Sequence, residues 1–330
     1  MSLLEVKELK MYYKLSSGWV KAVDDVSFKL GKGRTLGLVG ESGCGKTSVA
    51  MAIMRLLPFN AQIMGGNINL EGTDLTKLTE DEIREVRWKK VSMIFQGAMN
   101  AFNPVFKVGD QLVEAILTHE NVTDKEAKKR VINLFELVGL QPDRMNNYPH
   151  EFSGGMKQRA IIAMSLACNP HLVIADEPTT ALDVVMQDQI LNEINKLQQD
   201  FKLALIVISH DISVIAETCH EIAIMYGGKI FEIADATSIF HNPHNPYTIG
   251  LLNSFPTLRG PKRKLVSIRG SPPNLMGEKE GCLFEPRCPY AKPVCKEEVP
   301  TLTTIDSRKN HHSRCHFALD PKLQDIEFKE

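Results

Sequence analysis

The sequence predicts an α/β fold with a parallel sheet at its core, a helical insertion and a small C-terminal extension. Short apolar, β-branched runs at 35–39, 171–175 and 203–209 alternate with segments of helical spacing, as in α/β proteins with buried parallel strands. A glycine-rich loop directly follows the first of these runs. The composition changes near residue 256, beyond which 9 of the 17 prolines and four of the seven cysteines occur.

Length and composition indicate a globular protein. The chain has 330 residues, which suggests about two domains. Apolar residues make up 43% and charged residues 24%, and the formal net charge of −1 argues against a basic surface for nucleic acid. The apolar runs are far shorter than the roughly 20 residues that span a bilayer. The N-terminus is charged within its first five residues, so we expect no secretory signal and a cytosolic chain.

The expected elements follow one another along the first 250 residues. Their periodicity predicts strands at 23–30, 35–39, 171–175 and 203–209, and helices at 48–57, within 110–140 and at 153–168. We therefore divide the chain into a domain at 1–250, with a helical subdomain at about 97–168, and an extension at 251–330 that has few regular elements.

The loop between the strand at 35–39 and the helix at 48–57 predicts phosphate binding. It fits the pattern G-x-x-x-x-G-K-[ST] with Gly40, Glu41, Ser42, Gly43, Cys44, Gly45, Lys46 and Thr47. Glycines let backbone N–H groups curl around an anion, and the following helix, which includes Ser48, adds the positive end of its dipole. We expect Lys46 to reach the β- and γ-phosphates and the Thr47 hydroxyl to bind Mg²⁺. An ordinary glycine-rich turn is the alternative. We expect Cys44 to be a small residue that fits the loop, with a reactive thiolate near the helix N-terminus as the alternative.

Two carboxylates follow the apolar run at 171–175. Asp176 and Glu177 come at the carboxyl end of a predicted buried strand, where ligands bind in open α/β sheets. Adjacent strand residues point to opposite sides, so the two acids can take two roles. Asp176 suits Mg²⁺, and Glu177 suits a general base that polarises the attacking water. A solvated strand end is the alternative.

A second anion cradle is predicted before the helix at 153–168. Ser153, Gly154 and Gly155 stand where that helix begins, and a plain N-cap is the alternative interpretation.

Four cysteines of the extension suggest a metal site. Cys282, Cys288, Cys295 and Cys315 are clustered in a chain that we expect to be cytosolic, where metal is commoner than disulfide. Zinc sites more often use closely spaced cysteine pairs, whereas four thiolates suit a [4Fe–4S] cluster. Zinc and the absence of any metal remain alternatives. Three histidines offer substitute ligands: His311, His312 and His316.

Taken in order, these motifs resemble those of ABC-type ATPases over about residues 3–235. The resemblance implies ATP and Mg²⁺ as ligands, and head-to-tail pairs in which Ser153, Gly154 and Gly155 face the ATP of the partner. It implies that Gln96 is the Q-loop glutamine that meets Mg²⁺ and the attacking water, and that His210 is the switch histidine. Asp183, within residues 181–183, matches the D-loop. Tyr13 is similar to the aromatic residue that stacks on adenine, although Tyr12 stands beside it.

A narrower resemblance concerns residues 100–106, 242–248, 270–275 and 281–289. These segments are similar to the ATPases of oligopeptide and dipeptide importers, a branch that includes nickel importers. The resemblance implies an iron–sulfur cluster at the four cysteines. It also implies two membrane permeases, an extracytoplasmic solute-binding protein and a second, different ATPase chain, with this chain peripheral at the cytoplasmic side of the membrane.

Three other functions are weighed against peptide import. The first is import of nickel or another small solute by the same kind of machine. The second is a soluble ABC ATPase with a metal module that acts on nucleic acid, which the missing basic surplus disfavours. The third is a scaffold with a degenerate ATP site, which the presence of Glu177 and His210 disfavours.

Overall fold

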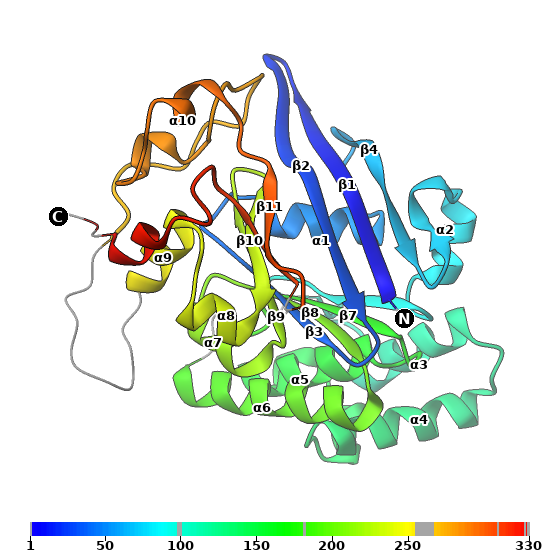
Figure 1. Cartoon of the computed structure of the whole chain (residues 1–330). Coiled ribbons are helices and arrows are strands. Elements are labelled where there is room, and N and C mark those ends of the chain that lie inside the picture. Colours follow the sequence, from blue (N-terminus) through cyan, green and yellow to red (C-terminus); the bar gives the residue numbers. More distant parts are fainter. Residues whose placement is uncertain are drawn as a thin grey trace. The chain divides into compact units, whose positions relative to one another are not determined.

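The computed structural model describes residues 2–97, 101–180, 183–254, 267–308, 310–326 and 328. The chain forms two compact units, each of which takes up several stretches of sequence (Figure 1). The first consists of residues 1–3, 30–34 and 77–208, and we call it the helical unit. The second consists of residues 4–29, 35–76 and 209–330, and we call it the sheet unit. The boundary near residue 250 stays a prediction.

The helical unit is built on parallel strands. β6 (Val91–Ile94) pairs with β7 (Leu172–Asp176), and β7 pairs with β8 (Ala204–Ser209). Every residue of the three strands is buried, which explains why their sequences are continuous apolar runs rather than alternating ones. The register sets Ile94 opposite Ala175, so the segments after β6 and β7 leave the same edge of the sheet.

Helices complete this unit. They are α2 (Glu80–Val86), α3 (Val108–His119), α4 (Asp124–Leu137), α5 (Gly154–Ser165) and α6 (Val184–Phe201), with the 3₁₀ turns η3 (Pro142–Asn146) and η4 (Pro149–Glu151). The expected helix within 110–140 is a pair, α3 and α4, which pack side by side (Figure 1). A capping box of Thr123 and Glu126 begins α4 and stabilises it by about 1 kcal/mol.

The sheet unit contains an antiparallel sheet and a mixed one. The antiparallel sheet has the order β2 (Gly18–Gly31), β1 (Ser2–Leu15), β4 (Ala61–Leu70) and β5 (Thr73–Asp74). In the mixed sheet β3 (Thr35–Val39) runs parallel to β9 (Glu221–Tyr226), and β9 forms a hairpin with β10 (Lys229–Asp235). Its helices are α1 (Lys46–Met54), α7 (Ile212–Thr218), α8 (Ala236–His241), α9 (Pro246–Asn253) and the short α10 (Val294–Glu297).

The extension is more regular than the sequence analysis anticipated. β11 (Leu302–Asp306) and β12 (His311–Arg314) form a hairpin, and β12 pairs with β10. The buried amide of Asn245 donates to the Phe231 and Arg314 carbonyls at 2.9 and 3.1 Å, which fastens the hairpin to the sheet. An aromatic cluster of Tyr226, Tyr247 and Phe284 packs with ring centroids 4.6–5.3 Å apart. The extension therefore shares the core of the sheet unit.

Over the parts of the chain that the structure describes, none of the helices combines the length and apolar character that crossing a bilayer requires.

Candidate nucleotide site and cysteine pocket

The glycine-rich loop stands between β3 and α1, as the sequence predicts. β3 is buried throughout, and α1 begins at Lys46, with Gly45 as its N-cap in a left-handed conformation. Ser42, Gly43 and Thr47 are exposed, whereas Lys46 is 6% exposed. A loop at a helix N-terminus with exposed backbone is suited to bind an anion.

Lys46 lies folded over its own loop. Its Nζ donates to the carbonyl oxygens of Gly40 at 2.8 Å and Glu41 at 3.0 Å, and it lies 3.7 Å from Cys44 Sγ. The two backbone carbonyls thus hold the ammonium group at the loop. Cys44 is buried, and burial raises the pKa of its thiol, so this cysteine fills space rather than acting as a thiolate.

Two glycines of the loop are required by backbone contacts. A Cβ on Gly40 would stand 2.1 Å from the Met225 carbonyl oxygen, and one on Gly45 would stand 2.2 Å from that of Ala22. Gly43 also has a positive φ of +79°, but a Cβ there would meet nothing within 4 Å. Gly40 and Gly45 therefore allow the loop to pack closely against β9 and β2. At Gly43 there is room for a side chain.

One of the two strand-end acids of the helical unit, Glu177, contacts the predicted Q-loop glutamine. Asp176 is the last residue of β7 and is 1% exposed. Glu177 follows it, and its Oε2 accepts hydrogen bonds from Gln96 Nε2 at 2.7 Å and from Thr180 Oγ1 at 2.9 Å. The register of β6 and β7 brings Gln96 and Glu177 together across 81 positions of sequence. A carboxylate oriented by two donors can serve as a general base.

The backbone of Glu177 adopts an uncommon conformation for a non-glycine residue. Its φ is +48°, and its N–H donates to the Ile208 carbonyl oxygen at 2.9 Å. Left-handed conformations of such residues cost about 1–3 kcal/mol and cluster at functional sites. This left-handed residue lies directly after the last residue of β7.

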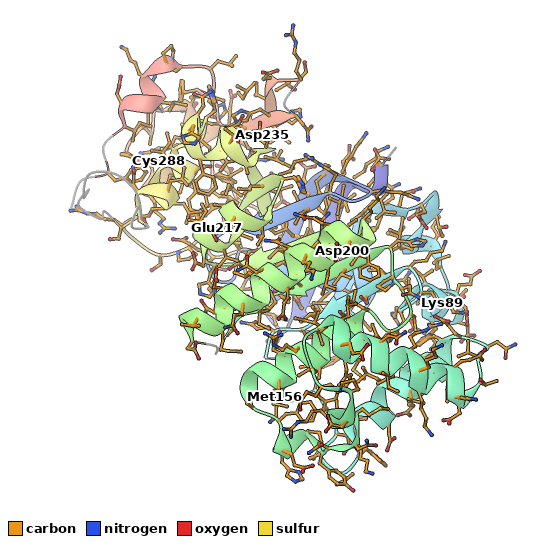
Figure 2. The ribbon with its side chains drawn as sticks, turned by 90° about the horizontal axis from the view of Figure 1, so that it is seen from below. Lys89, Met156, Asp200, Glu217, Asp235 and Cys288 are labelled. Atoms are coloured by element: carbon orange, nitrogen blue, oxygen red, sulfur yellow. The ribbon has the colours of Figure 1, made fainter. Side chains whose placement is uncertain are left out.

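The predicted signature begins α5. Ser153 is the N-cap, and its hydroxyl accepts from the Met156 N–H at 3.3 Å; Met156 is labelled in Figure 2. Ser153 and Gly154 are exposed and Gly155 is buried. A Cβ on Gly155 would stand 2.0 Å from Met186 Cε, so this glycine allows the start of α5 to approach α6.

The structure distinguishes the two neighbouring tyrosines. The Tyr13 hydroxyl lies 3.2 Å from Ser48 Oγ in the helix that follows the phosphate loop. The Tyr12 hydroxyl instead donates to Asp24 Oδ1 at 2.7 Å. Burial and the Asp24 carboxylate raise the pKa of Tyr12, which marks it as a structural group. Tyr13 is the tyrosine beside the loop.

The remaining predicted motifs lie at element boundaries. His210 is exposed and directly follows β8. Asp183 is the N-cap of α6, where its carboxylate accepts from the Met186 N–H at 2.9 Å. Ala181 and Leu182 of the D-loop segment lie outside the described residues, as does Asn100 of the segment after the Q-loop. The predicted nucleotide residues are divided between the two units.

The four cysteines of the extension line one small cavity of the sheet unit. Cys282, Cys288, Cys295 and Cys315 all line it, together with apolar and aromatic neighbours such as Phe284. Their sulfur atoms belong to free thiols. Burial raises the pKa of Cys288 and of Cys315 to about 12 each, so both are protonated at neutral pH. Within the described ranges, no three Cys, His, Asp or Glu side chains are grouped as a ready-made metal site.

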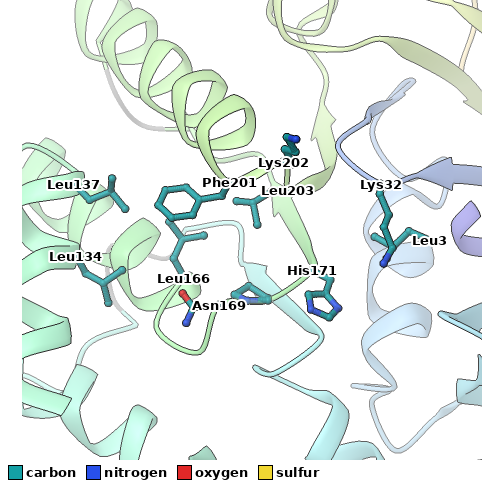
Figure 3. Close-up of a pocket in the computed structure, with 11 residues that line it drawn as sticks. Leu3, Lys32, Leu134, Leu137, Leu166, Asn169, His171, Phe201, Lys202 and Leu203 are labelled. Carbon is teal, nitrogen blue, oxygen red and sulfur yellow. The ribbon is translucent and has the colours of Figure 1, made fainter. Parts of the chain in front are cut away.

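A separate hollow of about 200 Å³ opens in the helical unit (Figure 3). Leucines, Phe201, Lys32 and Lys202 line it, and His171 lies at its edge immediately before β7. It is therefore at the amino end of β7, opposite the end that carries Asp176. Ligands of open α/β sheets bind at the carboxyl ends, so this hollow is not the nucleotide site.

Two residues of the site were missed by the sequence analysis. Thr180 stands three positions after Glu177, and a hydroxyl at that spacing after a strand-end acid was the available signal. Arg287 lies between two of the cysteines and contacts Glu41 in the phosphate loop, 246 positions away. Nothing in the sequence links those two positions.

The fold matches that of solved ATP-binding cassettes. A dimeric cassette in a post-hydrolysis state bound to ADP and Pi has a TM-score of 0.64 and 24% identity, covering 71% of this chain and 98% of that one. A second structure, of a dimeric bacterial ABC transporter cassette, has the same TM-score and 25% identity. The ABC transporter family matches residues 23–180, and the C-terminal region family of oligopeptide/dipeptide transporters matches residues 231–295.

Relatives share most of the chain. The oligopeptide transport ATP-binding protein OppD of Escherichia coli is 44% identical over 91% of this chain and 89% of that protein. The dipeptide transport ATP-binding protein DppD of Escherichia coli is 42% identical over 97% and 98%, and OppD of Bacillus subtilis is 46% identical over 92% and 86%. The chain belongs to the ABC transporter ATPases, in the branch of the oligopeptide and dipeptide transport ATP-binding proteins.

Proposed function

We propose that this chain is the ATP-hydrolysing subunit of an importer of di- and oligopeptides. The observation that carries the proposal is the similarity to peptide transport ATP-binding proteins, which includes the C-terminal region as well as the cassette. The chain's own residues supply ATP chemistry, and we expect solute selectivity to reside in other subunits. Nickel or another small solute is the alternative cargo for the same machine.

The phosphate loop holds the nucleotide in this proposal. The backbone of residues 40–45 cradles the phosphates, and Lys46 turns from its own carbonyls to the β- and γ-phosphates. Thr47 and Ser48 lie in the first turn of α1, at the positive end of its dipole. Tyr13 stacks on the adenine ring, which its place beside Ser48 supports.

Glu177 accepts a proton from the attacking water. Gln96 and Thr180 orient its carboxylate, and His210 contacts the γ-phosphate. Thr47, Gln96 and Asp176 offer hydroxyl, amide and carboxylate oxygens, the ligand types that Mg²⁺ prefers. When bound, Mg²⁺ neutralises charge on the phosphates during transfer. The chemistry therefore needs side chains at the ends of β6 and β7 in fixed directions.

The signature serves the partner's nucleotide in a head-to-tail pair. Ser153, Gly154 and Gly155 cover the triphosphate bound by the other chain, and Asp183 communicates across the dimer. The partner is a second, different ATPase chain. ATP favours the closed pair over the open one, and hydrolysis reopens it, which is a shift between two populations. The exposed N-terminus of α5 supports this role.

The cysteine pocket holds a [4Fe–4S] cluster, with Zn²⁺ as the alternative. Four thiols that line one cavity supply the ligand set, and no other described cysteine lines that cavity. A bound metal would replace the thiol protons and link the segments of the extension that carry the four cysteines. Iron and acid-labile sulfide after anaerobic purification would support a cluster. Stoichiometric zinc without sulfide would favour the alternative. If the protein held neither iron nor zinc, both assignments would be refuted.

The chain acts with two permeases and an extracytoplasmic solute-binding protein, at the cytoplasmic side of the membrane. The segment after Gln96 exposes apolar side chains that a permease can cover: Val105 is 70% exposed and Phe106 is 56% exposed. Phe95 beside Gln96 is also exposed. The placement of these residues near the Q-loop supports a docking surface that senses the permeases.

Reconstitution into vesicles tests the function. The chain is assembled with the permeases and second ATPase of its transport complex, and ATP hydrolysis is measured with binding protein plus di- or oligopeptide, or plus Ni²⁺. We expect peptide to stimulate hydrolysis and to accumulate inside the vesicles, and a complex carrying Glu177→Gln to do neither. Stimulation by Ni²⁺ alone would overturn the peptide assignment. Failure to assemble with permeases, with retention of nucleic acid at moderate salt, would overturn transport altogether.

A further inference from the structure

An arginine of the extension reaches the phosphate loop. Arg287 lies on the 3₁₀ turn η5 (Glu285–Arg287), between Cys282 and Cys288, and its side chain is 5% exposed. Its Nη1 donates to Glu41 Oε2 at 2.6 Å and its Nη2 to Glu41 Oε1 at 2.8 Å. This is a bidentate pair, the geometry in which an arginine fixes a carboxylate most strongly.

The guanidinium group is held on every side. Its Nε donates to the Arg269 carbonyl oxygen at 2.7 Å, and Nη1 also reaches the Tyr226 hydroxyl at 3.2 Å. The guanidinium carbon, Cζ, lies 5.7 Å from the centre of the Tyr226 ring and 6.0 Å from the centre of the Phe284 ring. Arg287 therefore has a single direction in which to present its fork, and that direction is Glu41.

Glu41 in turn sets the conformation of the loop. Its N–H donates to the Tyr247 hydroxyl at 3.1 Å, and its carbonyl oxygen accepts from Lys46 Nζ at 3.0 Å and from the Cys44 N–H at 3.2 Å. Glu41 thus connects three parts of the unit. Its side chain contacts Arg287 of the extension, its N–H contacts Tyr247 of α9, and its carbonyl contacts Lys46. A carboxylate in a loop that binds a triphosphate is also a source of repulsion unless a cation neutralises it.

We propose that Arg287 is a positioning residue for nucleotide binding: it cancels the charge of Glu41 and holds the phosphate loop in the conformation that accepts ATP. The proposal rests on the proposed role of residues 40–47 as the phosphate site. It gives the extension a task in the ATPase cycle that is independent of whether the cysteines hold a metal.

The backbone around Arg287 links this task to the cysteine pocket. The Cys282 N–H donates to the Cys295 carbonyl oxygen at 2.7 Å, and the Cys288 N–H donates to that of Glu285 at 3.1 Å. The turn that carries Arg287 is thus bounded by two residues of the pocket.

The test measures Mg-ATP affinity of the full chain and the ATPase of the assembled complex. Arg287→Ala is expected to raise the dissociation constant and KM for Mg-ATP about tenfold, with kcat changed far less. Arg287→Lys, which keeps the charge but loses the fork, is expected to fall between that variant and the wild type. Arg269→Ala, which removes an exposed arginine of the same region, is the matched control and is expected to bind like the wild type.

A charge-neutralising second substitution separates repulsion from general damage. Adding Glu41→Gln to Arg287→Ala removes the uncompensated carboxylate and is expected to recover most of the lost affinity. Wild-type affinity in Arg287→Ala, or a double variant as weak as Arg287→Ala, would overturn the proposal. If circular dichroism shows that Arg287→Ala does not fold, Arg287→Lys is used as the test in its place. A wild-type KM for Mg-ATP in Arg287→Lys would then overturn the proposal. Lys46→Ala with undiminished affinity would instead refute the phosphate site itself.

Discussion

The phosphate loop and the strand-end acids are built in different ways. The loop is one continuous stretch whose shape is set by backbone: Gly40 and Gly45 allow contacts with neighbouring carbonyls that no side chain would permit. The acid site is made of side chains from the ends of two strands, joined by the hydrogen bond between Gln96 and Glu177. The difference teaches that variants of the loop should change binding and stability, whereas variants of the acid site should change turnover.

The largest expected effect is on turnover. Glu177→Gln keeps the hydrogen-bonding shape but removes the proton acceptor, so kcat should fall at least about 100-fold while Mg-ATP still binds. The measurement is steady-state ATPase of the assembled complex in which the partner's own site is already disabled, with bound nucleotide determined in parallel. Turnover at the wild-type level would show that Glu177 is not the general base.

The second prediction concerns stability of the loop. Gly45→Ala forces a side chain against the Ala22 carbonyl oxygen at positive φ and should lower the free energy of unfolding by about 2 kcal/mol or more. Gly43→Ala has a similar φ but open space, and should cost only about 1 kcal/mol. Urea unfolding of both variants checks this. Equal costs would show that the contact with Ala22 is not what requires glycine.

A smaller effect is expected at the glutamine that orients Glu177. Gln96→Ala removes the 2.7 Å hydrogen bond, and kcat should fall about tenfold with little change in KM. Thr180→Val removes the second donor while keeping a similar shape, and should cost less. A change confined to KM in either variant would place these residues in binding rather than in turnover.

The smallest expected effect is at the adenine side. Tyr13→Ala should weaken Mg-ATP binding about fivefold, which is the low end of the roughly 1–3 kcal/mol that stacking on a base contributes, and Tyr13→Phe should preserve it. Tyr12→Ala is the neighbouring control. It removes the bond to Asp24 and should lower stability without weakening nucleotide binding. Titration with a fluorescent nucleotide distinguishes the two tyrosines. A loss of nucleotide affinity in Tyr12→Ala but not in Tyr13→Ala would make Tyr12 the residue that stacks on adenine.

Much of the fold follows from local patterns in the sequence. The strands predicted at 35–39 and 171–175 are apolar runs bounded by glycine or acids. The structure confirms them as β3 (Thr35–Val39) and β7 (Leu172–Asp176). β1 escaped prediction because lysines and glutamates interrupt its alternation and its pairing with β4 shifts register between Lys7 and Met11. The β11–β12 hairpin escaped because its strands are short and polar and gain burial only by joining β10.

The candidate site was predictable where its residues are contiguous and not where they are distant. The loop from Gly40 to Thr47 carries its chemistry in one motif. The bond of Gln96 to Glu177 depends on strand register, and that of Arg287 to Glu41 depends on how the extension folds back. Contacts over such separations are set by tertiary structure alone.

Mg-ATP binding to the purified chain, with and without its partner ATPase, is the most direct test of the loop as nucleotide site. The wild-type chain should bind Mg-ATP. Lys46→Ala should bind it about 10- to 100-fold more weakly, because it loses a hydrogen bond between charged groups. A wild-type chain that fails to bind in either setting, or a Lys46→Ala chain that binds equally well, would contradict it.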